Sequence, residues 1–234
     1  MRIMMIAPGT FPLAEMKARE DYAKSVCSPG TTLLLACVEG TCPPHTDQSR
    51  FSLLVPGILQ RVNEAEMEGY DAVVIDCCTD VGLEAAKTTA AIPVVGPSES
   101  NFHIACLLAD KFGWIIVDDE GISPYWRLAK TYGMADRITS MKALNIPPPE
   151  YRDRKDELEA KLTKLAQGMA NNGAQLILLG CTAVFPTMGI GSALKLSRKL
   201  GIPVMDPIGI ALRVAEMLAS LNLSQSKASF PKAV

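Results

Sequence analysis

Histidine is scarce in this sequence, with two residues among 234. A Ser-His-Asp triad or a histidine-rich metal site therefore has little material to draw on. His103 stands between apolar neighbours on an expected helix, which favours a core position over a substrate contact. His45 lies in an expected loop that could reach a cleft, but nothing else in the sequence supports a role for it.

Excess charge and long apolar runs are also missing. The formal net charge is −2 and the isoelectric point is about 5.8, so there is no basic field for nucleic acid or for an anionic membrane surface. No apolar stretch reaches the roughly 18 to 20 residues that span a bilayer, and Met1–Ile6 is too short for the apolar part of a signal peptide. We therefore expect a soluble cytoplasmic protein whose partner is a small molecule.

An even disulfide framework is absent, because the seven cysteines are odd in number and scattered along the chain. We interpret them as reduced thiols. Cys77 and Cys78 are adjacent, but no second cysteine pair and no histidine cluster supplies the remaining ligands of a metal site. A vicinal redox or metal role for this pair thus has little support, and no cofactor is expected.

Short apolar runs alternate with segments of helical spacing along the chain, and hydrophobic residues make up 48% of it. Strands that are apolar on both faces are typical of a parallel sheet covered by helices, so the pattern predicts an α/β fold. The expected strands are residues 2–6, 32–38, 72–76, 93–95, 114–117, 138–144, 176–179 and 203–205. The expected helices are residues 13–26, 55–68, 81–90, 101–112, 125–132, 152–171, 191–200 and 208–221.

The sequence contains an internal repeat. An apolar run leads from Gly69 to Cys77 and another from Gly173 to Cys181, and glycine and cysteine are eight positions apart in both. Each is followed by a similar short strand. We predict two similar lobes, each a short parallel sheet flanked by helices: residues 1–97 with 208–221, and residues 98–207. Residues 222–234 are expected to form a flexible tail.

Cys77 and Cys181 both fall where a parallel strand ends and the next helix begins, which is where open α/β sheets bind ligands. Helix amides there favour the thiolate and can lower a thiol pKa from about 8.5 toward neutrality. A lone cysteine at a strand end is usually a core residue, but its recurrence in both units favours function. If the units face each other, one thiolate and one thiol can invert an acidic carbon without a cofactor.

Backbone amides and hydroxyls at three loops are candidates for binding carbonyl or carboxylate oxygens and for stabilising an enolate. The threonines among them could equally be helix N-caps. The candidate substrate-binding residues are Pro8, Gly9, Thr10, Thr79, Asp80, Thr182 and Ala183.

These segments resemble the aspartate/glutamate/hydantoin racemase superfamily, and within it the hydantoin and allantoin racemases. The similar stretches are Ser28–Thr31, Glu68–Cys77, Asp80–Leu83, Ile92–Gly96, Leu179–Cys181 and Gly201–Asp206. The resemblance implies two lobes related by a pseudo-two-fold axis, with substrate between them and with Cys77 and Cys181 as the two acid/base residues. It implies a cofactor-independent isomerase that racemises a 5-substituted hydantoin or an allantoin-like compound.

Three segments depart from the hydantoin racemase pattern. Ala7–Thr10 replaces Asn-Pro-Asn-Thr, which removes a side-chain amide that would contact substrate, and Asp76–Asp80 replaces Ala-Cys-Phe-Gly-Asp. Gly180–Ala183 replaces Gly-Cys-Ala-Gly and is more similar to amino-acid racemases, maleate isomerases and arylmalonate decarboxylases. The decarboxylases keep only the second cysteine, so Cys77 argues against that activity.

Three alternatives stay open at this point. An aspartate racemase or a maleate isomerase would also use both cysteines, and a two-lobed binding protein would close on a ligand without chemistry. Apolar sheet edges and helix faces are compatible with a homo-oligomer, although no spacing selects one.

Overall fold

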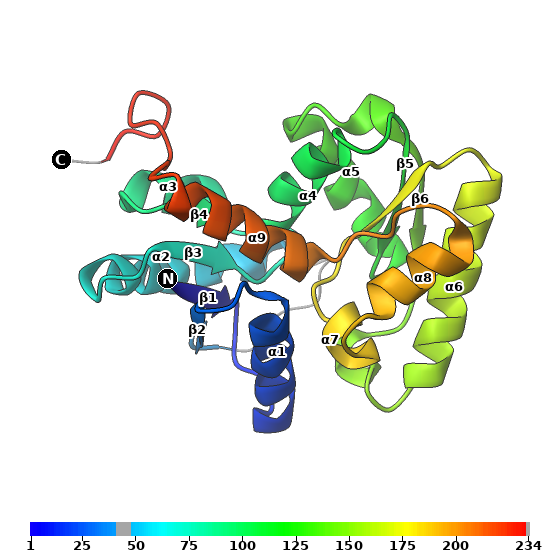
Figure 1. The fold of residues 1–234 in the computed structure, drawn as a ribbon, viewed down its shortest axis with the longest axis horizontal. Helices are drawn as coiled ribbons and strands as arrows, with labels where there is room; N and C mark the ends of the chain where they lie inside the picture. Colours follow the sequence, from blue (N-terminus) through cyan, green and yellow to red (C-terminus); the bar gives the residue numbers. More distant parts are fainter. Residues whose placement is uncertain (41–47, 233–234) are drawn as a thin grey trace. The chain divides into compact units, whose positions relative to one another are not determined.

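The structure, a computed structural model, describes residues 1–40 and 48–232. His45 and Cys42 lie outside the described residues. The chain divides into two compact units, residues 1–100 with 208–234 and residues 101–207 (Figure 1). Each unit has its own parallel sheet with helices packed on it.

The first unit is built on a four-stranded sheet in the order β2-β1-β3-β4, and all of its strand pairs are parallel. The strands are β1 (Arg2–Ala7), β2 (Thr32–Cys37), β3 (Ala72–Ile75) and β4 (Val94–Val95). The helices that begin in the first unit or belong to it are α1 (Leu13–Val26), α2 (Gln48–Met67), α3 (Leu83–Thr89), α4 (Pro97–Ala105) and α9 (Pro207–Ser220).

Successive residues of β1 point to opposite faces of this sheet, and both faces are buried. Met4 and Ile6 belong to a core that also includes apolar residues of α2 and α3. Ile3 and Met5 belong to a second core that includes residues of α1 and α9. Side chains alternate between faces along a strand, so a central strand that is apolar at every position requires helices on both sides.

The second unit has a three-stranded parallel sheet in the order β6-β5-β7, extended by an isolated parallel bridge between Ile177 and Val204. The strands are β5 (Phe112–Ile116), β6 (Ile138–Ala143) and β7 (Leu176–Leu179). The helices are α5 (Ile122–Thr131), α6 (Lys155–Asn171), α7 (Val184–Met188) and α8 (Ser192–Leu200), with 3₁₀ turns η1 (Asp119–Gly121), η2 (Ala135–Arg137) and η3 (Pro148–Glu150).

The two sheets have the same connectivity. In each, the second strand pairs on one side of the first strand and the third strand on the other, and the chain segment after that continues outward beside the third. The prediction of an α/β fold with two short parallel sheets flanked by helices is confirmed. A pseudo-two-fold relation between the lobes stays a prediction.

The expected helix 101–112 is displaced, because α4 begins at Pro97 and ends at Ala105. Proline suits the first helical position, where its missing N–H costs nothing. The amides that follow are capped by the Asp80 carboxylate, 18 positions from Ser98, so no local signal marks this start. The helix expected from residue 55 begins at Gln48 and accommodates Pro56 in its interior.

The expected strand 203–205 forms only the single bridge at Val204. Helix α7, which begins three residues after Cys181, was not predicted, because five residues are too few to show a helical period.

The flexible tail expected over residues 222–234 stays a prediction, but residues 222–232 make side-chain contacts with the first unit. The Gln225 side chain bonds to both the N–H and the C=O of Val94, each at 3.1 Å. The Lys227 ammonium donates to the carbonyl oxygens of Lys87 and Ala90. These contacts hold the segment against the edge of the sheet at β4 and the end of α3.

A buried carboxylate joins the two chain segments of the first unit. Glu216 of α9 accepts hydrogen bonds from the amide of Ser28 at 2.7 Å, the hydroxyl of Ser28 at 2.7 Å and the hydroxyl of Thr31 at 2.6 Å. Its side chain is 9% exposed. Burial raises the pKa of Glu216, but the hydrogen bonds from Thr31 and Ser28 outweigh this, so the pKa lies below its usual value. The Ser28–Thr31 motif thus has a structural role.

Replacing Glu216 by Gln should lower the free energy of unfolding at neutral pH by about 1–3 kcal/mol, because the donors on Ser28, Thr31 and Arg213 lose a charged acceptor. A carboxyl whose pKa is lowered by folding stabilises the fold above its unfolded pKa, about 4.3, and this contribution disappears as the pH falls through the folded value. The difference between wild type and Glu216→Gln in urea unfolding should therefore shrink below about pH 4. Glu68→Gln, at an exposed position, is the control; a pH-independent difference would contradict this role for the charge.

Candidate active site

Cys77 lies two positions beyond the end of β3. The amide of Asp76 continues the sheet by donating to Ile6 O at 2.8 Å, and the amide of Cys77 then turns back to Ile75 O at 2.8 Å. The side chain of Cys77 is buried, and its Sγ lies 3.1 Å from Oγ1 of Thr79. The chain therefore leaves the sheet at this cysteine, with a hydroxyl beside the sulfur.

Cys181 occupies the corresponding position in the second unit, two residues beyond the end of β7. The amide of Gly180 continues the sheet by donating to Ile115 O at 2.8 Å, as Asp76 does in the first unit. Cys181, Thr182 and Ala183 are all buried, and α7 begins at the next residue. The two cysteines thus have the same register in their own sheets.

The residue before each cysteine is held by the helix that follows the first strand of its unit, but the contact differs. In the first unit, Arg19 of α1 donates to the Asp76 carboxylate at 3.0 Å, and both side chains are buried. In the second, the hydroxyl of Tyr125 on α5 donates to the carbonyl of Gly180 at 2.6 Å. A Cβ on Gly180 would lie 3.1 Å from the Tyr125 ring, so glycine leaves room for this approach.

The carboxylate of Asp80 caps the N-terminus of α4. Its two oxygens accept from the amides of Ser98 at 3.0 Å and Glu99 at 2.8 Å, which are the donors that an N-cap side chain would satisfy. The backbone of Asp80 is left-handed, with φ 50°, a conformation that costs most side chains but is tolerated by Asp. A Cβ on Gly96 would lie 2.7 Å from the carboxyl carbon, so Gly96 permits the contact.

Both the amide and the hydroxyl of Thr10 bind a neighbouring loop. Its amide donates to Gly40 O at 2.7 Å and its hydroxyl to the same oxygen at 3.1 Å. Gly9 has φ 128°, a conformation that side chains rarely adopt, and its amide donates to Ala7 O. Pro8 and Gly9 are buried at the end of β1. The structure therefore gives the Thr10 side chain a role in the loop itself.

The other described cysteines lie in different surroundings. Burial, reinforced by the nearby Glu216 carboxylate, raises the pKa of Cys27 to about 11, so this thiol stays protonated at neutral pH. Burial also raises the pKa of Cys37, at the end of β2. Cys78 is buried, and its carbonyl accepts a hydrogen bond from the Ser98 hydroxyl at 2.5 Å. None of the six cysteines in residues 1–40 and 48–232 forms a disulfide.

The described part of the chain brings no three His, Cys, Asp or Glu side chains close enough to hold a metal ion. Among its helices, none has the length and apolarity needed to cross a membrane. His103, expected in the core, is exposed at the end of α4 and stacks edge-on against Tyr132.

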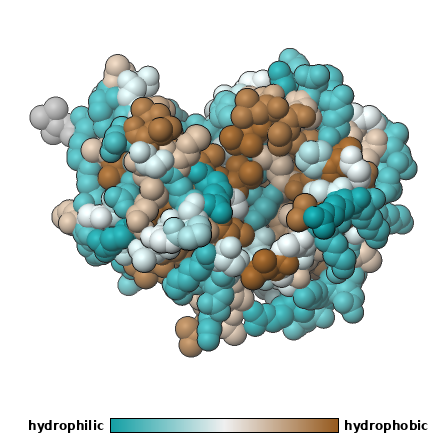
Figure 2. Space-filling model, viewed as in Figure 1, coloured by the Kyte–Doolittle hydropathy of each residue, from teal (hydrophilic) through white to brown (hydrophobic). Residues whose placement is uncertain are grey.

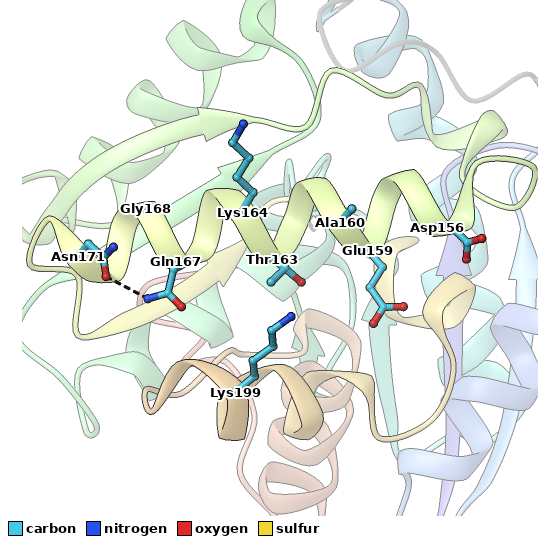
Figure 3. A pocket seen from close by; sticks show the side chains of 9 residues that line it. All are labelled: Asp156, Glu159, Ala160, Thr163, Lys164, Gln167, Gly168, Asn171 and Lys199. Atoms are coloured by element: carbon cyan, nitrogen blue, oxygen red, sulfur yellow. Dashed lines mark hydrogen bonds between the residues drawn. The ribbon is translucent and has the colours of Figure 1, made fainter.

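A groove of about 820 Å³ runs between α6 and α8 in the second unit, and none of the described cysteines lines it (Figure 3). Most of the residues that line it have polar side chains, with Lys199 reaching from α8 toward α6 and Gln167 donating to Asn171 at 3.0 Å. The outer surface over α8 is hydrophilic, with Lys195, Arg198 and Lys199 exposed (Figure 2). The groove is therefore a solvated surface separate from the Cys181 turn.

Comparison with known proteins agrees with this geometry. Residues 14–215 match the family described as Asp/Glu/hydantoin racemase. The chain belongs to this family. It is 30% identical to the hydantoin racemase of Pseudomonas sp. (strain NS671) over 97% of this chain and 89% of that protein, and 30% identical to the one from Paenarthrobacter aurescens over 98% and 95%. The allantoin racemase from Klebsiella pneumoniae superposes with a TM-score of 0.88 at 27% identity, covering 100% of this chain and 94% of that one.

Sequence reasoning located the two cysteines but missed the residues that hold their loops. Arg19 and Tyr125 lie on helices that carry other polar residues, and nothing local distinguishes them. The signal available for Asp80 was its place three residues after Cys77, and this suggested substrate binding. In the structure its carboxylate caps α4.

Replacing Asp80 by Ala should lower the free energy of unfolding by about 1–2 kcal/mol, because the α4 amides lose their cap. Asp80→Asn should cost less, since Asn keeps an acceptor oxygen and also tolerates a left-handed backbone. Urea unfolding of the two variants beside Asp21→Ala, at an exposed position of α1 in the same unit, measures the difference. Equal losses for Ala and Asn would argue against capping.

Proposed function

We propose that this protein is a cofactor-independent racemase of 5-substituted hydantoins or allantoin-like compounds that uses Cys77 and Cys181 as a pair of acid/base residues. One observation carries the proposal: each cysteine lies two positions beyond the equivalent strand of its unit, behind the same sheet hydrogen bond. The names of the relatives support the reaction class. The proposal requires the two units to face each other across the substrate.

The reaction needs one thiolate and one thiol. The thiolate takes the proton from C5 of the ring, and the electron pair left on carbon delocalises onto the C4 carbonyl oxygen as an enolate. The opposite thiol then donates its proton to the other face of C5, which gives the enantiomer. After one turnover the protonation states of the cysteines are exchanged, so the reverse reaction restores the enzyme.

The hydroxyl of Thr79 supports this role for Cys77, because at 3.1 Å it can donate to the sulfur when it is a thiolate. Thr182 and Ala183, between Cys181 and α7, are proposed to bind the carbonyl oxygen that becomes the enolate. We propose that Pro8 and Gly9 contribute backbone contacts, and that Thr10 and Asp80 shape the loops around them.

Cys77→Ser and Cys181→Ser should each reduce racemisation by at least about a hundredfold, since an alcohol is a far poorer general acid/base near neutral pH than a thiol. Each variant should still exchange the C5 hydrogen of one enantiomer for solvent deuterium, and the two variants should prefer opposite enantiomers. Polarimetry and NMR in D₂O measure the two processes separately.

Cys106→Ser is the matched control for the two serine variants, because Cys106 follows α4 and has no place in the mechanism. It should racemise at the wild-type rate. Normal racemisation by either active-site variant, or the same enantiomer preference in both, would refute the two-thiol mechanism.

A panel of substrates distinguishes the proposed hydantoin racemase from the alternative functions. We expect turnover of hydantoins or allantoin and none of aspartate or maleate. Turnover of aspartate alone would mean an amino-acid racemase, and conversion of maleate to fumarate would mean an isomerase with a cysteine nucleophile. Absence of turnover on every compound, with thiols that resist alkylation near neutral pH, would favour a binding protein.

A further inference from the structure

The C-terminal segment of residues 224–230, called here the C-terminal strap, is fastened to the first unit by three side chains. Gln225 pairs with the backbone of Val94 as a neighbouring strand would. The Lys227 ammonium binds Ala90 O at 2.5 Å and Lys87 O at 3.1 Å, at the last turn of α3. The Phe230 ring lies 5.3 Å from the Lys87 ammonium. Two of the three side chains, Lys227 and Phe230, contact Lys87 itself.

Lys87 is buried, with 8% of its side chain exposed, and its ammonium bonds both oxygens of Glu99 at 2.5 Å. Lysine is rarely buried to this extent unless it is paired. Buried ion pairs contribute little net stability compared with apolar residues, but removing one partner is costly. The pair therefore fixes the position of Glu99 on the first turn of α4 relative to α3.

The first turn of α4 in turn holds the loop that contains Cys77. The amides of Ser98 and Glu99 donate hydrogen bonds to the Asp80 carboxylate, and the Ser98 hydroxyl donates to Cys78 O. The amide of Asp80 donates to Cys77 O at 3.0 Å. An unbroken series of contacts thus runs from the strap through Lys87 and Glu99 to the backbone of Cys77.

Asp80 is the residue in this series whose backbone has a positive φ, 50°. Its left-handed backbone persists because the α4 amides hold the side chain on one side and the Cys77 carbonyl holds the amide on the other. If the first turn of α4 shifts, the loop can relax, and displacement of a reacting group by about 1 Å can cost about a hundredfold in rate.

We propose that the C-terminal strap and the Lys87–Glu99 pair are positioning elements of the reaction, which hold the Cys77 loop and leave Cys181 untouched. The proposal rests on the proposed function for its effect on turnover. Its effect on the reactivity of Cys77 can be measured independently of turnover.

The experiment compares full-length Lys227→Met, Lys87→Met and Glu99→Gln with wild type. Lys232→Met, which removes only the exposed ion pair with Glu66, is the control. Lys227→Met should lower kcat about tenfold with KM changed less than about threefold, because the reacting thiol is misplaced while the binding loops remain. Iodoacetamide should label Cys77 about tenfold faster, since local opening exposes a buried thiol. Peptide mass spectrometry assigns the label, and Cys181 in the same sample is the internal reference.

Lys87→Met should show the same changes more strongly. Because an unpaired Glu99 could impair folding, Glu99→Gln provides the milder version, and circular dichroism checks the fold of each variant. The proposal is overturned if folded Lys227→Met and Glu99→Gln keep the wild-type kcat and Cys77 labelling rate, or if labelling of Cys77 and Cys181 rises equally. If wild type turns over no hydantoin, the proposed function fails, while selective labelling of Cys77 still supports the positioning role.

Discussion

The arrangement of each candidate half-site depends on one hydrogen bond, from the amide of the residue before the cysteine to the first strand of the sheet. Asp76 makes it to Ile6 and Gly180 to Ile115, both at 2.8 Å. Because this bond fixes the last residue in register with the sheet, the next residue must leave at the carboxyl edge. The thiol therefore lies at the carboxyl ends of the parallel strands, where α/β proteins bind ligands.

The two units reach the same result with different chemistry. The first uses a buried ion pair between Arg19 and Asp76, and the second a neutral hydrogen bond from Tyr125. The contact in the first unit joins two full charges, whereas the contact in the second joins a phenol and a carbonyl dipole. The residue before each cysteine is thus held at the same register by full charges in one unit and by a neutral hydrogen bond in the other.

The sequence was informative where a pattern repeats and uninformative where contacts are distant. The paired Gly–Cys spacing predicted the register of Cys77 and Cys181, and the apolar runs predicted both sheets, because these features depend on neighbours along the chain. The start of α4, the contacts of Asp80 and the contacts of residues 222–232 depend on partners many positions away. Short polar segments such as that around Gln225 have no local feature that reveals such a partner.

The carboxylate of Glu216 has a consequence for the order in which the protein can assemble. The second unit is one continuous stretch, residues 101–207, whereas the first needs both ends of the chain. Ile208, Leu212 and Ala215 complete one face of the β1 sheet, and Glu216 closes the Ser28–Thr31 turn. During synthesis the core of the first unit can therefore form completely only after α9 has been made. The second unit is continuous in sequence and contains every strand of its own sheet before α9 is made.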